Sequence, residues 1–401
     1  MQSFDVIIFF PLISTFTNNL SFSKVFSRSL AKTETFGVGF MDIGIASFIV
    51  SSALTSRHAR NWTKNNLEKD QPVYKIGAVF LSASTLQKIA VLILGFGRLV
   101  TLRILDYQSH DTEYGTEWNF FVTLFFLWLL ADIVHHIFSR LQIILFSLFL
   151  LLGYQYALTE WGVTEYILNA PRSSFFSSNR EGILSLFGCL PLYLLSEEFS
   201  YYVFFRRSDG LSTNSKLNSK ELCFDNDVCF TNKSSPTRPS STKLSSKDHK
   251  NTENVNEGDR VNAFKNDRNF GILWRLTLSG AVLFVCWCGA EYIQPTSRRL
   301  FNLSFVLLNF LITVVGLLFL VFAERYLFLN NGSIYGLELF NKHQLAVFLV
   351  ANILTGVVNM TFRTIHCPTS LSMLILSVYI FIVHSLPWMM ERMLRATQAN
   401  N

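Results

Sequence analysis

Charged residues are scarce in this sequence. Only 15% of its 401 residues are Asp, Glu, Lys or Arg, whereas a soluble globular protein carries about 25%. Half of the residues are hydrophobic, and apolar runs long enough to cross a hydrocarbon core, about 20 residues, recur along most of the chain. The composition therefore excludes an ordinary soluble protein and predicts an all-α polytopic membrane protein.

The sequence also lacks the patterns of a metal site or a nucleic-acid interface. Cys286 and Cys288 form a C-x-C without partner ligands at zinc spacing. One D-x-x-H-H, from Asp132 to His136, is too little for the several histidine clusters of a non-haem iron lipid oxidase. No basic patch is interleaved with aromatic residues, so the net charge of +6 bears on membrane topology first. We predict no metal, no cofactor and no nucleic-acid partner.

Nine apolar segments are candidates for membrane-spanning helices. A further apolar stretch at residues 4–16 is shorter, contains Pro11 and follows no basic n-region, so it is neither a comfortable span nor a signal peptide. We therefore expect nine to ten transmembrane helices. The nine segments lie at roughly 36–55, 77–100, 118–138, 142–158, 182–205, 273–293, 301–323, 345–362 and 370–390.

Residues 207–272 interrupt the apolar pattern. They are rich in Ser, Asn, Lys and Thr and poor in aromatic residues, and such a stretch cannot bury enough apolar area to offset its ordering entropy. We predict a polar, disordered linker here. It would separate a first transmembrane bundle at 36–206 from a second at 273–392, which a polar tail at 393–401 follows.

The distribution of basic residues predicts the orientation of these helices. The short loop at residues 56–75 holds five Lys or Arg residues, which indicates a cytosolic loop. Alternation then places the linker and the carboxyl terminus in the cytosol and gathers the reactive side chains at the opposite surface. The alternative interpretation is that these are only solvated loops and helix caps. The loops of that opposite surface include 31–37, 106–121, 177–182 and 297–302.

The first predicted span and the loop at 106–121 contain candidate catalytic or binding residues. Asp42 lies inside the first predicted span, where a carboxylate is a functional candidate, although a helix-to-helix hydrogen bond would also explain it. His110 and Glu113 place a histidine beside a carboxylate, which could act as a base pair, while a lone loop histidine is often structural. Asn119, just inside the next helix, is a candidate for substrate binding.

The segment "SSNREG" at 177–182 places charge where an apolar helix begins. Asn179, or Ser178 before it, is a suitable N-cap, and Glu181 in the first turn favours the helix dipole. Neither effect explains Arg180, because a cation near a helix N-terminus is unfavourable. A phosphate bound nearby would explain the arginine, so Asn179, Arg180 and Glu181 are all substrate-binding candidates.

Three further residues are substrate-binding candidates. Arg298 and Arg299 could hold a phosphate, although interfacial snorkelling would also explain them. Asn359 lies in a predicted helix, where contact with another helix is the alternative explanation.

Five blocks of the chain, taken together, resemble the glycosylphosphatidylinositol (GPI) inositol acyltransferases, the PIG-W family. They occur in the family's order and extend from about residue 31 to 392. The blocks are "AKTETFGVGFMDIGIASFIVSSAL" (31–54), "DYQSHDTEYGTEWNFF" (106–121), "SSNREGILSLFG" (177–188), "SRRLFNLSFVL" (297–307) and "LAVFLVANILTGVVNM" (345–360).

This resemblance implies an endoplasmic reticulum enzyme with about thirteen transmembrane helices. Such an enzyme transfers a fatty acyl group, usually palmitoyl, from acyl-CoA to the inositol of glucosaminyl-phosphatidylinositol at the lumenal side. The expected partners are therefore palmitoyl-CoA as co-substrate, glucosaminyl-phosphatidylinositol and membrane lipid. The reactive loops would be lumenal and the carboxyl terminus cytosolic.

The resemblance also implies site residues. Lys32 matches the family's functional lysine, which could polarise the thioester carbonyl, hold a phosphate of CoA, or act as a base if desolvation lowers its pKa. Glu34 is close enough in sequence to pair with it. The family's aspartate, ten positions earlier, falls on Phe22, and Glu117 replaces a usual histidine. We therefore expect residues 1–35 to be an atypical segment that is truncated or mis-joined. The alternatives are that the chain is inactive or uses another acidic residue.

Two other function classes compete with this interpretation. A secondary transporter would line a path with broken helices, but its two halves are usually related, and the halves here differ in length. A different lipid O-acyltransferase would use a buried catalytic histidine, for which His384 in "FIVHSLPW" is the candidate.

Overall fold

The computed structural model describes residues 32–60, 83–104, 113–205, 257–326, 339, 342–362 and 367–399. Within these ranges the chain is helical, and the one β-type contact is a parallel bridge between Gly37 and Ser297. Six helices are long and apolar enough to cross a membrane, so this is a multi-pass membrane protein. They are α6 (Phe120–Ile137), α7 (Arg140–Glu160), α10 (Arg180–Ser200, continued by the π-helical turn η3, Tyr201–Phe205), α11 (Glu257–Ile293), α12 (Leu303–Tyr326) and α15 (Thr369–Ala399).

The nine predicted segments each contain a helix. The first differs most, because residues 32–39 form an irregular loop and the helix begins only at Ile43. Helix α11 begins at Glu257, inside the predicted linker, and residues 206–256 of that linker lie outside the described residues. The remaining helices are η2 (Phe40–Asp42), α2 (Ile43–Leu54), α5 (Ala83–Ile104), α8 (Val163–Asn169), α9 (Phe175–Ser178) and α14 (Gln344–Thr361).

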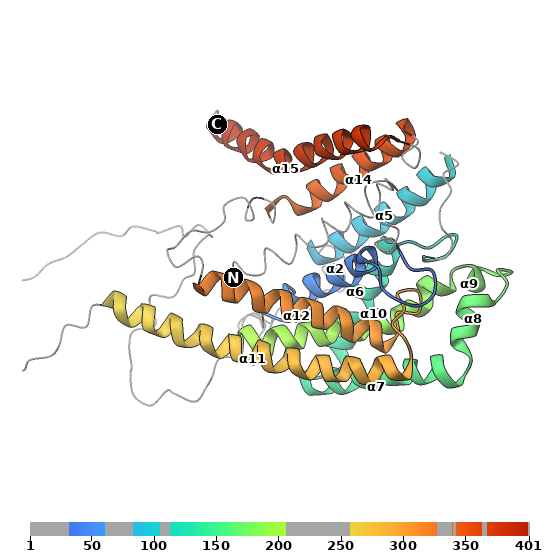
Figure 1. Ribbon diagram of the computed structural model, residues 1–401, viewed down its shortest axis with the longest axis horizontal. Helices are drawn as coiled ribbons and strands as arrows, with labels where there is room; N and C mark the ends of the chain where they lie inside the picture. Colours follow the sequence, from blue (N-terminus) through green and yellow to red (C-terminus); the bar gives the residue numbers. More distant parts are fainter. Residues whose placement is uncertain are drawn as a thin grey trace, which may run out of the picture. The chain divides into compact units, whose positions relative to one another are not determined.

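Helix α10 lies at the centre of the main core (Figure 1). It packs against α2, α6, α7 and α12, and Leu190, Leu192 and Leu194 are buried around its circumference. A helix that is apolar on all sides is typical of such a central position. The charged residues at its two ends are therefore held in fixed positions by the surrounding helices.

Helix α12 shares a core cluster with α10. Helix α12 follows the linker in sequence, yet Phe305, Val306 and Phe310 belong to the same core cluster as Leu190 and Leu192 of α10. Residues on both sides of the linker thus build one core.

Helices α14 and α15 pack on each other around a cluster of their own. Val347, Ala351 and Tyr379 are buried there, and the Tyr379 hydroxyl donates to the carbonyl oxygen of Ala351 over 3.2 Å. This pairing satisfies a polar group that lies inside an apolar contact.

Gly188 permits a close contact between α10 and the connection from α11 to α12. A Cβ at this position would lie 2.2 Å from the carbonyl oxygen of Phe301, which has a left-handed φ of 49°. Since the obstacle is backbone, Gly188→Ala is expected to lower the free energy of unfolding by about 1–3 kcal/mol. The thermal unfolding midpoint of the purified protein in detergent measures this.

The matched control is Gly316→Ala in α12. A Cβ there would meet nothing within 4 Å, and alanine favours a helix over glycine by about 1 kcal/mol. This variant should be unchanged or slightly stabilised. Equal losses of stability in the two variants would contradict the proposed contact.

Candidate active site

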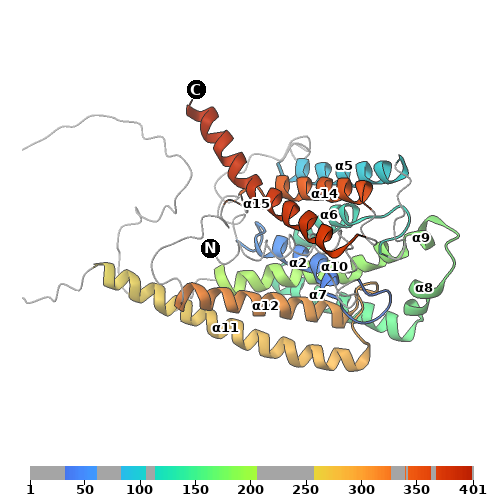
Figure 2. The same ribbon diagram turned by 45° about the horizontal axis from the view of Figure 1, so that its top comes forward.

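Four segments that are far apart in sequence meet where α10 begins. The Gly37 N–H donates to the carbonyl oxygen of Thr296 over 2.8 Å, and the Gly182 N–H donates to that of Tyr114 over 2.9 Å. In both views α8 and α9 lie at this end of α10, beside the connection between α11 and α12 (Figures 1 and 2). The four segments are 32–39, 113–119, 177–182 and 294–302.

One group of charged side chains links three of these segments, and we call it the Arg298 cluster. The Lys32 ammonium pairs with the Glu113 carboxylate. Arg298 Nη2 lies 3.6 Å from Glu113 Oε2, and Arg298 Nε lies 3.8 Å from Asp42 Oδ1. Because buried charges are costly unless they are paired, these residues stabilise one another. The cluster consists of Lys32, Asp42, Glu113, Tyr114 and Arg298.

Asp42 fixes the loop that carries Lys32. Its Oδ2 accepts hydrogen bonds from the N–H of Thr33 (3.1 Å), the Thr33 hydroxyl (2.9 Å) and the N–H of Gly39 (2.8 Å). The prediction that Asp42 lies inside a span needs correction, since Asp42 ends η2 and directly precedes α2. The carboxylate instead accepts hydrogen bonds from the loop through Oδ2, and its Oδ1 faces Arg298.

The charges of the cluster set the pKa values of its members. Burial alone would raise the pKa of Glu113, but Arg298 and Lys32 lower it to about 2. Burial lowers the pKa of Lys32 from its ordinary value, although Glu113 opposes this. Burial would also lower the pKa of Arg298, but Glu113, Tyr114 and Asp42 together outweigh it and the pKa is raised. Of these three groups, Lys32 is the one that moves toward the neutral form.

Helix α7 holds the segment that carries Arg298. The Tyr154 hydroxyl donates to the carbonyl oxygen of Leu300 over 2.7 Å. The Gln155 amide donates to the Gln294 side chain over 2.8 Å and accepts from the N–H of Leu303 over 3.0 Å. Neither residue was predicted to support the site, although two polar residues within an apolar span are a signal that the sequence contains.

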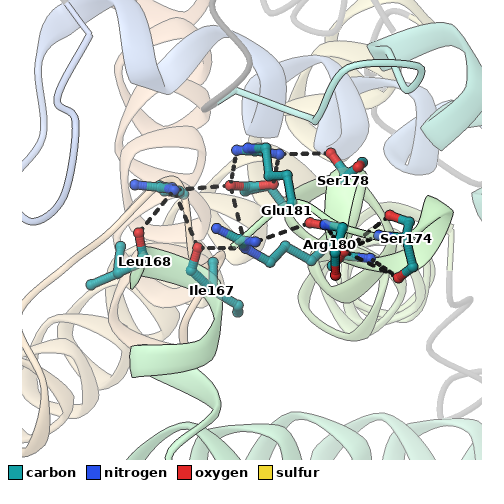
Figure 3. A network of polar contacts seen from close by, with 10 residues as sticks. Ile167, Leu168, Ser174, Ser178, Arg180 and Glu181 are labelled. Carbon is teal, nitrogen blue, oxygen red and sulfur yellow. Dashed lines mark hydrogen bonds and ion pairs between the residues drawn. The ribbon is translucent and has the colours of Figure 1, made fainter. Parts of the chain in front are cut away.

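A second group, the Glu181 cluster, surrounds the first turn of α10 (Figure 3). Glu181 Oε1 lies 2.6 Å from Arg172 Nη2, 2.9 Å from Arg299 Nη2 and 3.8 Å from Arg180 Nε. The Glu181 side chain is fully buried. One carboxylate therefore neutralises part of the charge of three arginines, a role beyond the predicted dipole interaction. The cluster consists of Arg172, Arg180, Glu181 and Arg299.

The arginines of the Glu181 cluster also donate to helix-end carbonyl groups. Arg180 donates from Nε to Ile167 over 2.9 Å and from Nη1 to Ser177 over 3.0 Å, and Arg299 Nη2 donates to Ile167 over 3.2 Å. Figure 3 shows Arg180 and Glu181 beside Ile167 and Leu168. These bonds satisfy carbonyl groups at the ends of α8 and α9. The predicted phosphate role of both arginines stays a prediction.

Comparison with known proteins identifies the family. The model of the GWT1 family matches residues 22–390. This chain belongs to the GWT1 family. These proteins are GPI inositol acyltransferases, as the resemblance to the PIG-W family had indicated.

Two relatives of this GWT1-family chain illustrate the match. It is 28% identical over 402 residues to the phosphatidylinositol-glycan biosynthesis class W protein of Dictyostelium discoideum, covering 92% of this chain and 69% of the relative. It is 27% identical over 368 residues to the GPI-anchored wall transfer protein 1 of Candida albicans, covering 91% and 68%. The family match over residues 22–390 covers all four segments of the site.

Two asparagines of the GWT1-family chain join the segments of the site. Asn179 precedes α10, but its side chain accepts from the N–H of Glu117 (2.8 Å) and donates to the carbonyl oxygen of Phe175 (3.0 Å) instead of capping the helix. Asn119 caps α6 by accepting from two N–H groups (3.0 and 3.2 Å) and donates to the carbonyl oxygen of Gly95 (2.9 Å). These bonds position the segment at 113–119 against the start of α10.

Three other predicted residues lie apart from these contacts. Glu34 is exposed in its loop, and Lys32 pairs with Glu113 in place of Glu34. His110 lies outside the described residues, and Asn359 lies on α14 with its side chain also outside them. Their substrate roles stay predictions.

The other end of α10 carries a third group, the Glu197 cluster, which was not predicted from the sequence. Glu197 Oε2 lies 2.8 Å from His135 Nε2, and Glu198 Oε2 lies 3.0 Å from Arg140 Nη1. The rings of His58 and His135 stack with centroids 3.5 Å apart, and Arg140 donates to the His58 carbonyl oxygen over 2.6 Å. Within the described ranges, no three His, Cys, Asp or Glu side chains are grouped as a metal site.

The Glu197 cluster predicts a pH dependence of stability. Burial and the neighbouring His135 lower the pKa of His58 from 6.5 to about 4, although Glu197 opposes this. Between these two values the unfolded chain binds more protons, so stability is present above pH 6.5 and is lost as the pH falls toward 4. The thermal unfolding midpoint should fall across that window.

Replacement of His58 tests this origin. His58→Gln should have a smaller decrease of the midpoint between pH 6.5 and 4 than the wild type. His384→Gln, at an exposed position of α15, should keep the wild-type decrease. An unchanged decrease in His58→Gln would assign the pH dependence to other groups.

Proposed function

We propose that this chain transfers a palmitoyl group from acyl-CoA to an inositol hydroxyl of glucosaminyl-phosphatidylinositol. The step belongs to GPI-anchor biosynthesis in the endoplasmic reticulum membrane. The single observation that carries the proposal is the pairing of Lys32 with Glu113 beside Arg298, where the family-matched segments meet. The family of the chain supports the reaction type.

In the proposed reaction the inositol oxygen attacks the thioester carbonyl carbon. Lys32, as a neutral amine, accepts the hydroxyl proton while the new C–O bond forms. The carbonyl oxygen carries the negative charge of the tetrahedral intermediate, then the C–S bond breaks and CoA leaves as a thiolate that takes up a proton. A positioned base of this kind contributes about 10²–10⁴-fold to the rate.

The neighbours of Lys32 have distinct roles in this mechanism. Glu113 stabilises the ammonium that forms when Lys32 accepts the proton, in the way that a carboxylate supports a base in a catalytic triad. Arg298 stays cationic and can stabilise the developing oxyanion. Burial lowers the pKa of Lys32 and so raises the fraction of free amine.

For the membrane arrangement we propose nine to ten spanning or membrane-embedded helices. Helices α2, α5 and α14 then join the six candidate spans. Helix α2 has 12 residues, about 18 Å at 1.5 Å per residue, so it reaches only part of the way across a core of about 30 Å. The Arg298 cluster faces the lumen and the carboxyl terminus faces the cytosol.

The competing functions find less support. The catalytic histidine of another O-acyltransferase should be buried, but His384 is exposed and its Nδ1 lies 2.9 Å from the Ile380 oxygen of its own helix. A transporter would require neither Lys32 nor an acyl-CoA substrate.

Expression of the chain in cells that lack inositol acylation separates these functions. We expect acylated glucosaminyl-phosphatidylinositol to appear among the GPI intermediates. If the chain reaches the membrane and no acylated intermediate forms, the proposal is wrong.

A further inference from the structure

Three polar atoms around Arg298 are buried without a well-formed hydrogen bond to any described residue. They are Asp42 Oδ1, Arg298 Nε and the Tyr114 hydroxyl. An unsatisfied buried polar atom costs about 1–3 kcal/mol, and native proteins contain few of them. Three such atoms around one guanidinium indicate a place for a polar ligand group.

The contacts between these atoms are looser than hydrogen bonds. Arg298 Nε and Asp42 Oδ1 are 3.8 Å apart, which is too long for a hydrogen bond. The Arg298 guanidinium carbon lies 5.7 Å from the centroid of the Tyr114 ring. Tyr114 is itself held in place, because its carbonyl oxygen accepts from the Gly182 N–H at the start of α10.

The chemistry of the three atoms selects the ligand group. Asp42 Oδ1 can only accept, Arg298 Nε can only donate, and the Tyr114 hydroxyl can do either. Asp42 and Glu113 already pair with Arg298 and Lys32, so neither a phosphate nor a cation would meet an unpaired charge, which disfavours the predicted phosphate role of Arg298. A neutral hydroxyl group, which both donates and accepts, satisfies all three atoms.

We propose that Tyr114, together with Asp42 and Arg298, binds one hydroxyl of the acceptor's polyol ring and selects for it. This inference rests on the proposed function, because it concerns the acceptor of that same reaction. Tyr114 is then a specificity-determining residue that holds the ring while Lys32 acts on another hydroxyl. Tyr114 is close to Lys32 because it directly follows Glu113, the partner of Lys32. Burial raises the pKa of Tyr114, so its hydroxyl keeps the proton that it donates.

The variant Tyr114→Phe removes only the hydroxyl and tests this role. The acceptors are glucosaminyl-phosphatidylinositol and analogues that each lack one ring hydroxyl. For the wild type we expect one analogue to lose about tenfold in kcat/KM, as the loss of about 1.4 kcal/mol from one hydrogen bond would give. Tyr114→Phe should lose a similar factor with the normal acceptor, mainly through KM, and should discriminate less against that analogue, because only Asp42 and Arg298 still contact the hydroxyl. The KM for acyl-CoA should be unchanged.

The matched control is Tyr166→Phe. Tyr166 also has an arginine near its ring, with the Arg180 guanidinium carbon 5.7 Å from the centroid, but the ring is partly exposed on α8. This variant should discriminate as the wild type does. If Tyr114→Phe also keeps wild-type discrimination, the hydroxyl does not contact the acceptor and the inference is wrong.

Binding measured without acyl-CoA separates this inference from the proposed function. The acceptor lipid should raise the thermal unfolding midpoint of the wild type more than that of Tyr114→Phe, whether or not transfer occurs. Stronger stabilisation of the wild type without any acyl transfer would support the hydroxyl site and contradict the proposed reaction. Equal stabilisation of both proteins would reject the hydroxyl site alone.

Discussion

Lys32→Arg is expected to lower the rate of acyl transfer by about 10²–10⁴-fold, the contribution of a positioned base. Arginine keeps the positive charge and the pairing with Glu113, but it does not release its proton in the working pH range. The variant therefore removes the base and retains the cation. The measurement is kcat with palmitoyl-CoA and glucosaminyl-phosphatidylinositol, which should rise with pH in the wild type as Lys32 loses its proton.

A second lysine–carboxylate pair provides the control for Lys32→Arg. Lys88 of α5 pairs with Asp132 of α6, away from the Arg298 cluster, so Lys88→Arg should transfer at the wild-type rate. If Lys32→Arg retains full activity with an unchanged pH profile, Lys32 acts as a cation and not as the base.

Glu181→Gln is expected to lower the free energy of unfolding by about 3–5 kcal/mol, the typical effect of removing one partner of a buried ion pair. Glutamine has nearly the same shape, but it leaves Arg172, Arg180 and Arg299 without their shared carboxylate. The two most buried arginines cannot regain the solvation that they lost on folding. Thermal or denaturant unfolding in detergent measures the loss.

Glu165→Gln is the control for this substitution. Glu165 lies in α8, close in sequence to the same region, but its side chain is exposed, and exposed charges contribute little to stability. Its unfolding midpoint should match the wild type. A Glu181→Gln protein as stable as Glu165→Gln would show that the carboxylate does not hold the three arginines together.

The sequence predicted which segments would meet, because alternation of spans places loops at one of two ends. Lys32, Glu113 and Arg298 come from three such loops, and the structure brings them into contact. The apolar segments were also recognisable, since hydropathy depends on composition and not on packing. The family followed from the order of the five blocks and is confirmed by the match over residues 22–390.

Contacts between particular side chains could not be predicted in this way. Tyr114 and Arg172 gain their roles only from the packing of α10 against neighbouring loops, which the sequence does not specify. Asp42 was placed inside a helix because "FGVGFM" is as apolar as a span, whereas the loop geometry at Gly37, with φ of 99°, delays the helix. Glu197 and Glu198 interrupt an apolar segment, and that signal could have revealed the third cluster.

Acyl transfer by the purified full chain in lipid vesicles tests the central claim most directly. Isotopically labelled palmitoyl-CoA and glucosaminyl-phosphatidylinositol are supplied, and mass spectrometry locates the acyl group on the product. We predict labelled palmitate on the inositol ring with the wild type and Lys88→Arg, and almost none with Lys32→Arg. Label on the inositol at equal rates in all three proteins, or no label with the wild type, would contradict an active site built around Lys32, Glu113 and Arg298.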